Sequence, residues 1–372
     1  MADHFLPRDY FQALFDALQG RGYRCRGPRV RDGAIVMDEV AGADDLCFGL
    51  RDRQAPGSYA LEAGTGRYFA WANGPMALKP LTFAPRETLW RASRDGDGAL
   101  SFTEPEPDAQ AVAVIGARAC DLAGLALQDQ HFLGDEPDAH YQARRANLFL
   151  VAVNCTHPAD TCFCAATGDG PEASHSFDLV LSELDHGFLV RAGSDAGASV
   201  LEELPLVAAT EAQNAEASAA IDAAAAAQSR GLPSRNLRDF LFANPTHPRW
   251  EEVAERCLSC GNCTNVCPTC FCHSQETVPD LEGTTADQVR QWDSCFTAGH
   301  STIHGIVIRG STANRYRQWL THKLGGWHDQ FGRSGCVGCG RCITWCPTGI
   351  DLTEEIAAMW ADPEAKKGGG DD

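Results

Sequence analysis

The chain of 372 residues has a formal net charge of −19 at pH 7, and 44% of its residues are hydrophobic. This length accommodates two domains with substantial cores, and the apolar content is ordinary for a globular protein. The acidic charge argues against nucleic acid or an anionic membrane as a partner, because both would repel the chain. The first residues do not show the basic segment and apolar segment of a secretory signal. The longest apolar runs are also much shorter than the roughly 20 residues of a membrane-spanning helix. We therefore expect a cytoplasmic protein.

The N-terminal part should contain one helix followed by strands. Apolar residues recur at helical spacing from Pro7 to Leu18, and Gly20 follows as a stop signal, so an amphipathic helix is expected there. Between residues 29 and 90, short apolar runs alternate with Gly and Pro, which is typical of strands. The runs at 58–61 and 67–72 are predicted to form a hairpin.

The next stretch alternates between strand and helix patterns, which predicts an α/β layer. Residues 111–117 and 147–153 are short continuous apolar runs, as expected for buried strands. Residues 121–132, which lie between them, have helical periodicity. Two further strand patterns, 177–184 and 188–191, flank a short Asp-His-Gly turn and predict a second hairpin.

Two cysteine runs in the C-terminal third, 257–268 and 336–347, share the spacing C-x2-C-x2-C-x3-C-P. This is the bacterial ferredoxin pattern for [4Fe–4S] clusters, and glycines inside both runs permit the tight loops that it requires. In two-cluster ferredoxins the fourth cysteine of each run binds the other cluster, so two crossed ligand sets are expected. The first set consists of Cys257, Cys260, Cys263 and Cys346. The second set consists of Cys336, Cys339, Cys342 and Cys267. Zinc is the alternative, but structural zinc sites usually divide their ligands into two separated pairs.

These motifs suggest a division of the chain into two domains. We expect an N-terminal mixed α/β domain at 1–235 and a C-terminal, largely helical domain at 236–372 that is ferredoxin-like and holds two [4Fe–4S] clusters. The Ala-rich stretch 210–229, a helix or a linker, precedes the boundary. An insertion at about 274–330 separates the two cysteine runs, which lie closer together in simple two-cluster ferredoxins. The tail after Pro363 is expected to be disordered.

The insertion carries two groups of polar residues. Five basic residues form a patch in an otherwise acidic chain, either as a solvated helix face or as a docking site for an acidic partner. They are Arg309, Arg315, Arg317, His322 and Lys323. His300 and His304 are four residues apart and would meet on one face of a helix, where we expect an exposed pair rather than a metal site.

Four cysteines ahead of the ferredoxin motifs form a candidate third set. Cys120 and Cys155 each follow a predicted strand, and Cys162 and Cys164 lie in the loop after the second strand. Ligand sites of open α/β sheets gather at the carboxyl ends of strands, so these four thiols would converge. Four thiolates suffice for a further [4Fe–4S] cluster or for zinc. The alternative is that they are separate buried thiols.

The remaining cysteines carry a weaker signal. Cys270, Cys272 and Cys295 are three thiols without an obvious fourth. They could hold a cluster with a non-cysteine ligand, act as redox-reactive thiols, or pack around the ferredoxin clusters. Cys25 and Cys47 stand alone and are expected to be structural thiols.

The cysteine-rich segments resemble a known family. Residues 257–272 (CLSCGNCTNVCPTCFC), 292–296 (WDSCF) and 336–351 (CVGCGRCITWCPTGID) are similar to the electron-transfer β subunit of soluble cytoplasmic [NiFe] hydrogenases of the sulfhydrogenase type. The A subunit of anaerobic sulfite reductases is similar too. The resemblance extends upstream through segments between residues 116 and 164, so it covers most of the chain.

This resemblance implies an iron–sulfur subunit that relays electrons and does not itself catalyse. Its partners would be a flavoprotein subunit that uses FAD and NAD(P)H, and the small and large subunits of a [NiFe] hydrogenase. The chain has neither the paired C-x-x-C motifs of a nickel site nor a dinucleotide fingerprint, so hydrogen chemistry and hydride transfer are not expected here. The resemblance also favours a third [4Fe–4S] cluster at the four upstream cysteines. Two alternatives stay open: the electron-transfer subunit of an anaerobic sulfite reductase, and a sulfur- or polysulfide-reducing subunit that uses Cys270, Cys272 and Cys295.

Overall fold

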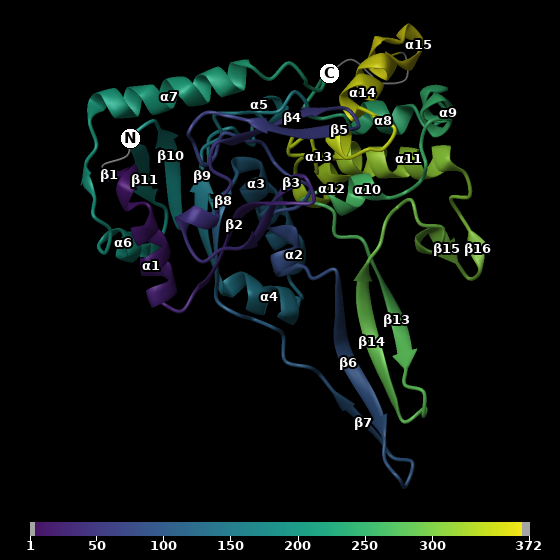
Figure 1. The fold of residues 1–372 in the computed structure, drawn as a ribbon. Coiled ribbons are helices and arrows are strands. Elements are labelled where there is room, and N and C mark those ends of the chain that lie inside the picture. The colour runs from purple at the N-terminus through teal and green to yellow at the C-terminus, as the bar shows by residue number, and fades with distance from the viewer. Residues whose placement is uncertain (1–3, 367–372) are drawn as a thin grey trace.

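The computed structural model describes residues 4–366 and shows a mixed α/β fold with a projecting arm (Figure 1). Its largest element is an eight-stranded sheet whose four central strands are parallel neighbours and whose outer pairs are antiparallel. From one edge to the other the strands are β12 (Val207–Ala208), β1 (His4–Pro7), β11 (Gly187–Ala192), β10 (Leu179–Leu184), β9 (Leu148–Val153), β8 (Val112–Ala117), β2 (Arg24–Arg31) and β3 (Ala34–Glu39).

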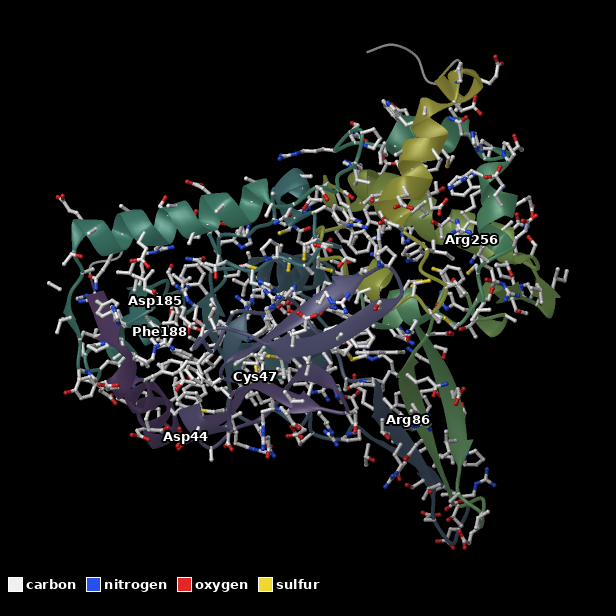
Figure 2. The ribbon with its side chains drawn as sticks, turned by 45° about the horizontal axis from the view of Figure 1, so that its top comes forward. Asp44, Cys47, Arg86, Asp185, Phe188 and Arg256 are labelled. Carbon is white, nitrogen blue, oxygen red and sulfur yellow. The ribbon has the colours of Figure 1, made fainter. Side chains whose placement is uncertain are left out.

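Helices cover both faces of this sheet, because successive side chains of its central strands point to opposite sides. In β9, Phe149, Val151 and Val153 belong to one core, while Leu150 and Ala152 belong to another. The first core also holds apolar residues of α1 (Gln12–Gly20), and the second holds those of α3 (Ala119–Phe132). Three further helices pack around the sheet: α4 (Ala139–Ala146), α6 (Asp195–Leu201) and α7 (Glu211–Ala226). Figure 2 labels Cys47 and Phe188, two buried members of the first core.

The projecting arm joins the N-terminal half to the insertion between the cysteine runs. It is a four-stranded antiparallel sheet that extends away from the rest of the molecule (Figure 1). Its strands, in order, are β13 (His273–Pro279), β14 (Thr285–Trp292), β6 (Arg86–Arg94) and β7 (Leu100–Thr103). At its root, Arg290 pairs with Glu87 and Asp138, and all three side chains are largely buried.

Two short hairpins complete the β structure. In the first, β4 (Leu50–Ala55) pairs with β5 (Ser58–Ala63), and the turn between them meets the second cysteine run, where Gly57 N donates to Ile343 O at 3.1 Å. The second consists of β15 (Thr302–Ile303) and β16 (Ile306–Val307) in the insertion.

The C-terminal part is built mainly from short helices around a core of its own. They are α8 (Arg238–Ala243), α9 (Arg249–Ala254), α10 (Asn262–Asn265), α11 (Thr312–Thr321), α12 (Trp327–Phe331), α13 (Arg341–Thr344), α14 (Leu352–Ala361) and α15 (Pro363–Lys366), with a π-helical turn at His322–Gly326. Two more short helices, α2 (Lys79–Thr82) and α5 (Cys164–Thr167), lie in the N-terminal half. Within residues 4–366, none of the helices combines the length and apolar character needed to cross a membrane.

Several predicted elements agree with the structure. The buried strands β8 and β9, the helix α3 between them and the hairpin of β10 and β11 all lie where they were predicted. The Ala-rich stretch is the helix α7 rather than a linker. The domain boundary near residue 235 stays a prediction. The tail after Pro363 was predicted to be disordered, but its described part belongs to the helix α15 (Pro363–Lys366), and residues 367–372 lie outside the described residues.

Three predictions of local structure were wrong. The first helix begins at Gln12 rather than Pro7, because residues 4–7 pair with β11 as a strand. The hairpin of β5 forms with β4 instead of with 67–72, since the backbone N–H groups of Tyr68 and Phe69 are bound by the buried carboxylate of Glu183 at 2.8 Å each. The C-terminal domain, predicted to be largely helical, also contains strands, because its insertion contributes β13 and β14 to the arm.

Candidate metal centres

The first crossed cysteine set lines one pocket. Cys257, Cys260 and Cys263 come from the loop that leads into α10, and Cys346 reaches the same pocket from the end of α13. Gly261 shapes this loop with φ +74°, and a Cβ there would lie 2.9 Å from Ser294 Oγ. Cys260 is exposed and its neighbour Leu258 is 65% exposed, so this pocket lies close to the protein surface.

The pocket wall contains a buried polar group with no partner among the described residues. The Tyr316 hydroxyl lies on the wall, and no hydrogen-bond acceptor of residues 4–366 is in range. Burial raises the pKa of Tyr316 well above its usual value, so the hydroxyl keeps its proton. A sulfur atom inside the pocket would accept that proton in a hydrogen bond, which fits an iron–sulfur group held by the four cysteines.

The second crossed set also assembles in space. Burial raises the pKa of Cys342 well above its usual value, and the three neighbouring sulfurs, those of Cys336, Cys339 and Cys267, add to the effect. Lys323 Nζ lies 3.3 Å from Cys267 Sγ and donates to Thr269 Oγ1 at 2.9 Å. Although burial opposes its charge, the neighbouring sulfur of Cys267, whose own pKa lies well below the usual value, raises the pKa of Lys323 well above its usual value. A buried cation, the ammonium group of Lys323, therefore lies beside the second set.

The third set, predicted from strand ends, converges as expected. Cys120 in the first turn of α3 and Cys155, Cys162 and Cys164 after β9 line one pocket with about 320 Å³ of free space, part of it open to solvent. Burial raises the pKa of Cys164 to about 12 and those of Cys120 and Cys162 well above their usual value. Because buried thiols resist ionisation, a bound metal is what would hold them as thiolates.

Two side-chain amides donate hydrogen bonds to sulfurs of the third set. Asn73 Nδ2 lies 2.8 Å from Cys120 Sγ, and Gln228 Nε2 lies 3.4 Å from Cys164 Sγ. Sequence reasoning missed both residues, because neither is near a cysteine in the chain.

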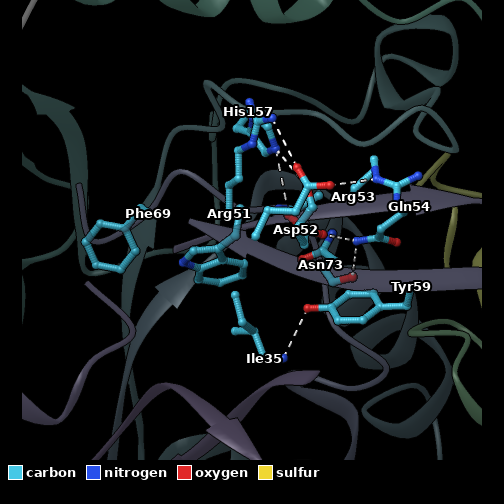
Figure 3. Close-up of polar contacts among 12 residues, drawn as sticks. Ile35, Arg51, Asp52, Arg53, Gln54, Tyr59, Phe69, Asn73 and His157 are labelled. Atoms are coloured by element: carbon cyan, nitrogen blue, oxygen red, sulfur yellow. Dashed lines mark hydrogen bonds and ion pairs between the residues drawn. The ribbon is translucent and has the colours of Figure 1, made fainter. Parts of the chain in front are cut away.

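A buried polar network holds Asn73 in place (Figure 3). Asp52 Oδ1 accepts from Ala72 N at 2.7 Å, and Gln54 Nε2 donates to Asn73 O at 3.1 Å. Gln54 Oε1 accepts in turn from the Thr344 hydroxyl at 2.8 Å. The strand β4 thus connects the third cysteine set with the helix α13 of the second cysteine run.

The three sets are arranged in a row, with the second set in the middle. Cys339 lies beside the third set: its backbone O is 3.9 Å from Cys162 Sγ, and its thiol raises the pKa of Cys162 and Cys164. On the other side, Cys263 of the first set lies close enough to raise the pKa of Cys342. Between the second and third sets, the buried side chains of Arg341 and Asp121 form an ion pair at 2.5 Å.

Two glycines allow the second and third sets to approach each other. Gly338 and Gly340 adopt φ +63° and +74°, in the left-handed region that other residues rarely occupy. A Cβ on Gly340 would lie 2.5 Å from Thr161 O, and one on Gly338 would lie 2.6 Å from Phe163 O. The loop that carries Cys162 and Cys164 therefore packs directly on the backbone of the second cysteine run.

Of the three remaining cysteines, Cys270 lies beside Cys267, whereas Cys272 and Cys295 lie beside each other. Cys270 shares a hydrogen bond with Cys267, which lowers the pKa of Cys267 and raises that of Cys270. Cys272 Sγ and Cys295 Sγ lie 3.9 Å apart, and a ring nitrogen of His300 lies within 4.8 Å of both sulfurs. Cys270 therefore lies outside the compact group of Cys272, Cys295 and His300, and a shared site of the three predicted thiols stays a prediction.

Two predictions for the insertion were wrong. His300 and His304 do not share a helix face, because His304 lies in the β15–β16 turn with φ +49° and His300 faces the cysteine pair. The five basic residues do not form one patch: Lys323 is buried against the second set, and Arg315 donates to Phe296 O at 3.0 Å. The two isolated cysteines, Cys25 and Cys47, lie buried in the main core, and burial raises their pKa to about 11 and about 12.

Comparison with known proteins gave two matches. Residues 256–350, which span both cysteine runs, match the 4Fe-4S dicluster domain family. Over 351 residues the chain is 30% identical to sulfhydrogenase 2 subunit beta of Pyrococcus furiosus, and this alignment covers 93% of the chain and 95% of the relative. No solved structure matches the chain. The dicluster match confirms the prediction of [4Fe–4S] chemistry over zinc for the C-terminal part.

Proposed function

Because this chain belongs to the sulfhydrogenase β-subunit family, we propose that it carries electrons through a row of three [4Fe–4S] clusters between two other subunits of a hydrogenase complex. The observation that supports this proposal most directly is the spatial order of the three cysteine sets, with the second set beside each of the others. Electrons move between redox centres only over short distances, so a row of adjacent sites provides a path through the protein.

The proposed ligands are the twelve cysteines of the three sets. The first cluster would be held by Cys257, Cys260, Cys263 and Cys346, the second by Cys336, Cys339, Cys342 and Cys267, and the third by Cys120, Cys155, Cys162 and Cys164. A [4Fe–4S] cluster, when bound, supplies one-electron redox chemistry. The crossed exchange of fourth cysteines is supported by Cys346, whose sulfur, together with those of Cys257 and Cys260, lies close enough to raise the pKa of Cys263.

The side chains around the sets would adjust the reduction potentials. Lys323 places a positive charge beside Cys267, which stabilises the more negative, reduced state of the second site. Asn73 and Gln228 donate hydrogen bonds to sulfurs of the third set, and such bonds act in the same direction. Large aromatic residues, including Tyr316 and Trp319, line the first pocket and add apolar surface around it.

The proposed partners dock at the two ends of this row. One end is the first set, where Cys260 and Leu258 are exposed. The other end is the third set, whose Cys155 is partly exposed. We propose a flavoprotein subunit with FAD that exchanges electrons with NAD(P)H at one end, and the small and large subunits of a [NiFe] hydrogenase at the other.

Anaerobic purification of the complex from its source tests the proposal. A flavoprotein and a nickel-containing subunit should copurify with the chain, and the complex should couple H2 oxidation to NAD(P)+ reduction. Substitution of Cys339→Ser, in the middle set, should abolish this coupled reaction while hydrogenase activity with an artificial electron acceptor persists. A sirohaem subunit in place of the nickel subunit would instead favour the sulfite reductase alternative.

A further inference from the structure

A compact group of metal-ligating side chains lies outside the three cysteine sets. Among residues 4–366, Cys272, Cys295 and His300 are the one set of three Cys, His, Asp or Glu residues whose ligand atoms all lie within 4.8 Å of one another. Cys295 is buried, and the other two residues are partly exposed. The cysteines of the three cluster sets do not form such compact groups, as expected where each thiolate binds a different iron atom of a cube.

The base of one hairpin brings the chain segments of the two cysteines together. Cys272 directly precedes β13, and Cys295 lies three residues after the last residue of β14. The hairpin register pairs His273 with Trp292, and Asp293 N donates to Cys272 O at 2.9 Å. This backbone hydrogen bond holds Cys272 beside Asp293, two residues before Cys295, so both cysteines lie at the hairpin base.

The distance between the two sulfurs is that of two ligands on one ion. Tetrahedral zinc with Zn–S bonds of about 2.3 Å separates two thiolate sulfurs by about 3.8 Å, and Cys272 Sγ and Cys295 Sγ lie 3.9 Å apart. A disulfide would instead bring the sulfurs to about 2.05 Å. The third ligand also has the support expected of a metal-bound histidine, because His300 Nδ1 lies 3.4 Å from Asp293 Oδ2.

We propose that Cys272, Cys295 and His300 bind a single divalent zinc ion, with water in the fourth position. Two thiolates and a neutral imidazole are a zinc ligand set, and binding releases the thiol protons to solvent and leaves the site with no net charge. The ion would link the base of the arm to Phe296, which lines the first cysteine pocket. This inference goes beyond electron transfer and is tested by zinc content, whereas the proposed function is tested by iron content and electron transfer.

The test compares two histidines four residues apart. The wild-type complex, purified anaerobically, should contain about one zinc per chain. His300→Asn should lower the zinc content roughly tenfold or more after dialysis against a weak chelator, with iron and acid-labile sulfide unchanged. His304→Asn is the matched control, because His304 is exposed in a turn outside the group, and it should retain the zinc.

Three results would overturn the zinc site: no zinc in the wild-type chain, equal zinc in His300→Asn, or a joint loss of iron and sulfide in that variant, which would mean a cluster instead. A second measurement covers the case in which His300→Asn fails to fold. Zinc-depleted wild-type complex titrated with Co2+ should develop a sulfur-to-metal charge-transfer band and the strong visible bands of tetrahedral cobalt. Their absence would contradict the proposal without any variant.

Discussion

Lys323 Nζ lies 3.3 Å from Cys267 Sγ, and both residues are buried. Lys323 is more than 50 residues away from Cys267 in the sequence, at the π-helical turn after α11. A buried cation beside a cluster ligand favours the reduced state of that cluster, since reduction adds one negative charge. If Cys267 holds the second cluster as proposed, Lys323 raises the reduction potential of that cluster.

Lys323→Met should lower the reduction potential of the second cluster, because the substitution removes the charge while keeping a similar side-chain length. The expected change is on the order of 100 mV, from a unit charge at short range in a medium of intermediate dielectric. An EPR-monitored redox titration measures it. Arg317→Met is the control, because its guanidinium contacts the backbone of Pro245 and no cluster sulfur. A potential that is the same in both variants would contradict the role of Lys323.

Asn73→Leu should lower the potential of the third cluster, because the hydrogen bond to Cys120 Sγ at 2.8 Å is lost. A hydrogen bond to a charged acceptor contributes about 1.5–3 kcal/mol, so a shift of roughly 60–130 mV is expected for a one-electron couple. Asn147→Leu is the matched control, since Asn147 donates to the backbone O of Ala143 at 2.9 Å instead of to a sulfur. A redox titration of both variants measures the potential of the third cluster. An unchanged potential in Asn73→Leu would contradict the role of the Asn73 hydrogen bond.

Gly340→Ala should disturb the contact between the second and third sets. Gly340 and Gly332 have similar backbone angles, φ +74° and +72°, but only at Gly340 would a Cβ meet a neighbour, Thr161 O at 2.5 Å. Gly332→Ala should therefore cost only the left-handed backbone penalty of about 1–2 kcal/mol. Gly340→Ala should destabilise the protein clearly more than Gly332→Ala does, and it should also lower the iron content. Thermal unfolding of both variants at one scan rate compares them, and equal destabilisation would show that the close packing is unimportant.

Removing one partner of the ion pair between Arg341 and Asp121 should lower the free energy of unfolding more than removing both partners. Arg341→Met leaves the buried carboxylate of Asp121 without its cation, which should destabilise the protein by about 3–5 kcal/mol. The double variant with Asp121→Asn should be less affected, because no uncompensated charge remains. Denaturant unfolding of the four proteins in this cycle measures the coupling, and strictly additive effects would contradict it.

The sequence predicted those features that depend on local pattern. The spacing of the two cysteine runs identified the dicluster domain, and the strand ends before Cys120 and Cys155 indicated that these residues converge. Both signals are local, because they depend on fixed loop lengths and on the alternation of strand and helix. The roles of the cysteines as cluster ligands stay predictions.

Features that depend on distant pairing could not be predicted in this way. The arm pairs β6 with β14, nearly 200 residues later, and neither strand has a strong apolar pattern. His300 joins Cys272 only because the base of the same hairpin brings Asp293 beside Cys272. Asn73 reaches Cys120 through a buried network that starts from Asp52 and Gln54. In each case tertiary structure, rather than sequence spacing, brings the residues together.

The iron and acid-labile sulfide content of the wild-type chain and of Cys155→Ser tests the central claim of three clusters in a row most directly. Cys155 is the least buried member of the third set, so its substitution should disturb the fold least. We predict about twelve iron and twelve sulfide per wild-type chain, and about eight of each in the variant, with the EPR signals of the other two clusters retained. About eight iron and eight sulfide in both proteins would contradict the third cluster and the continuous electron path.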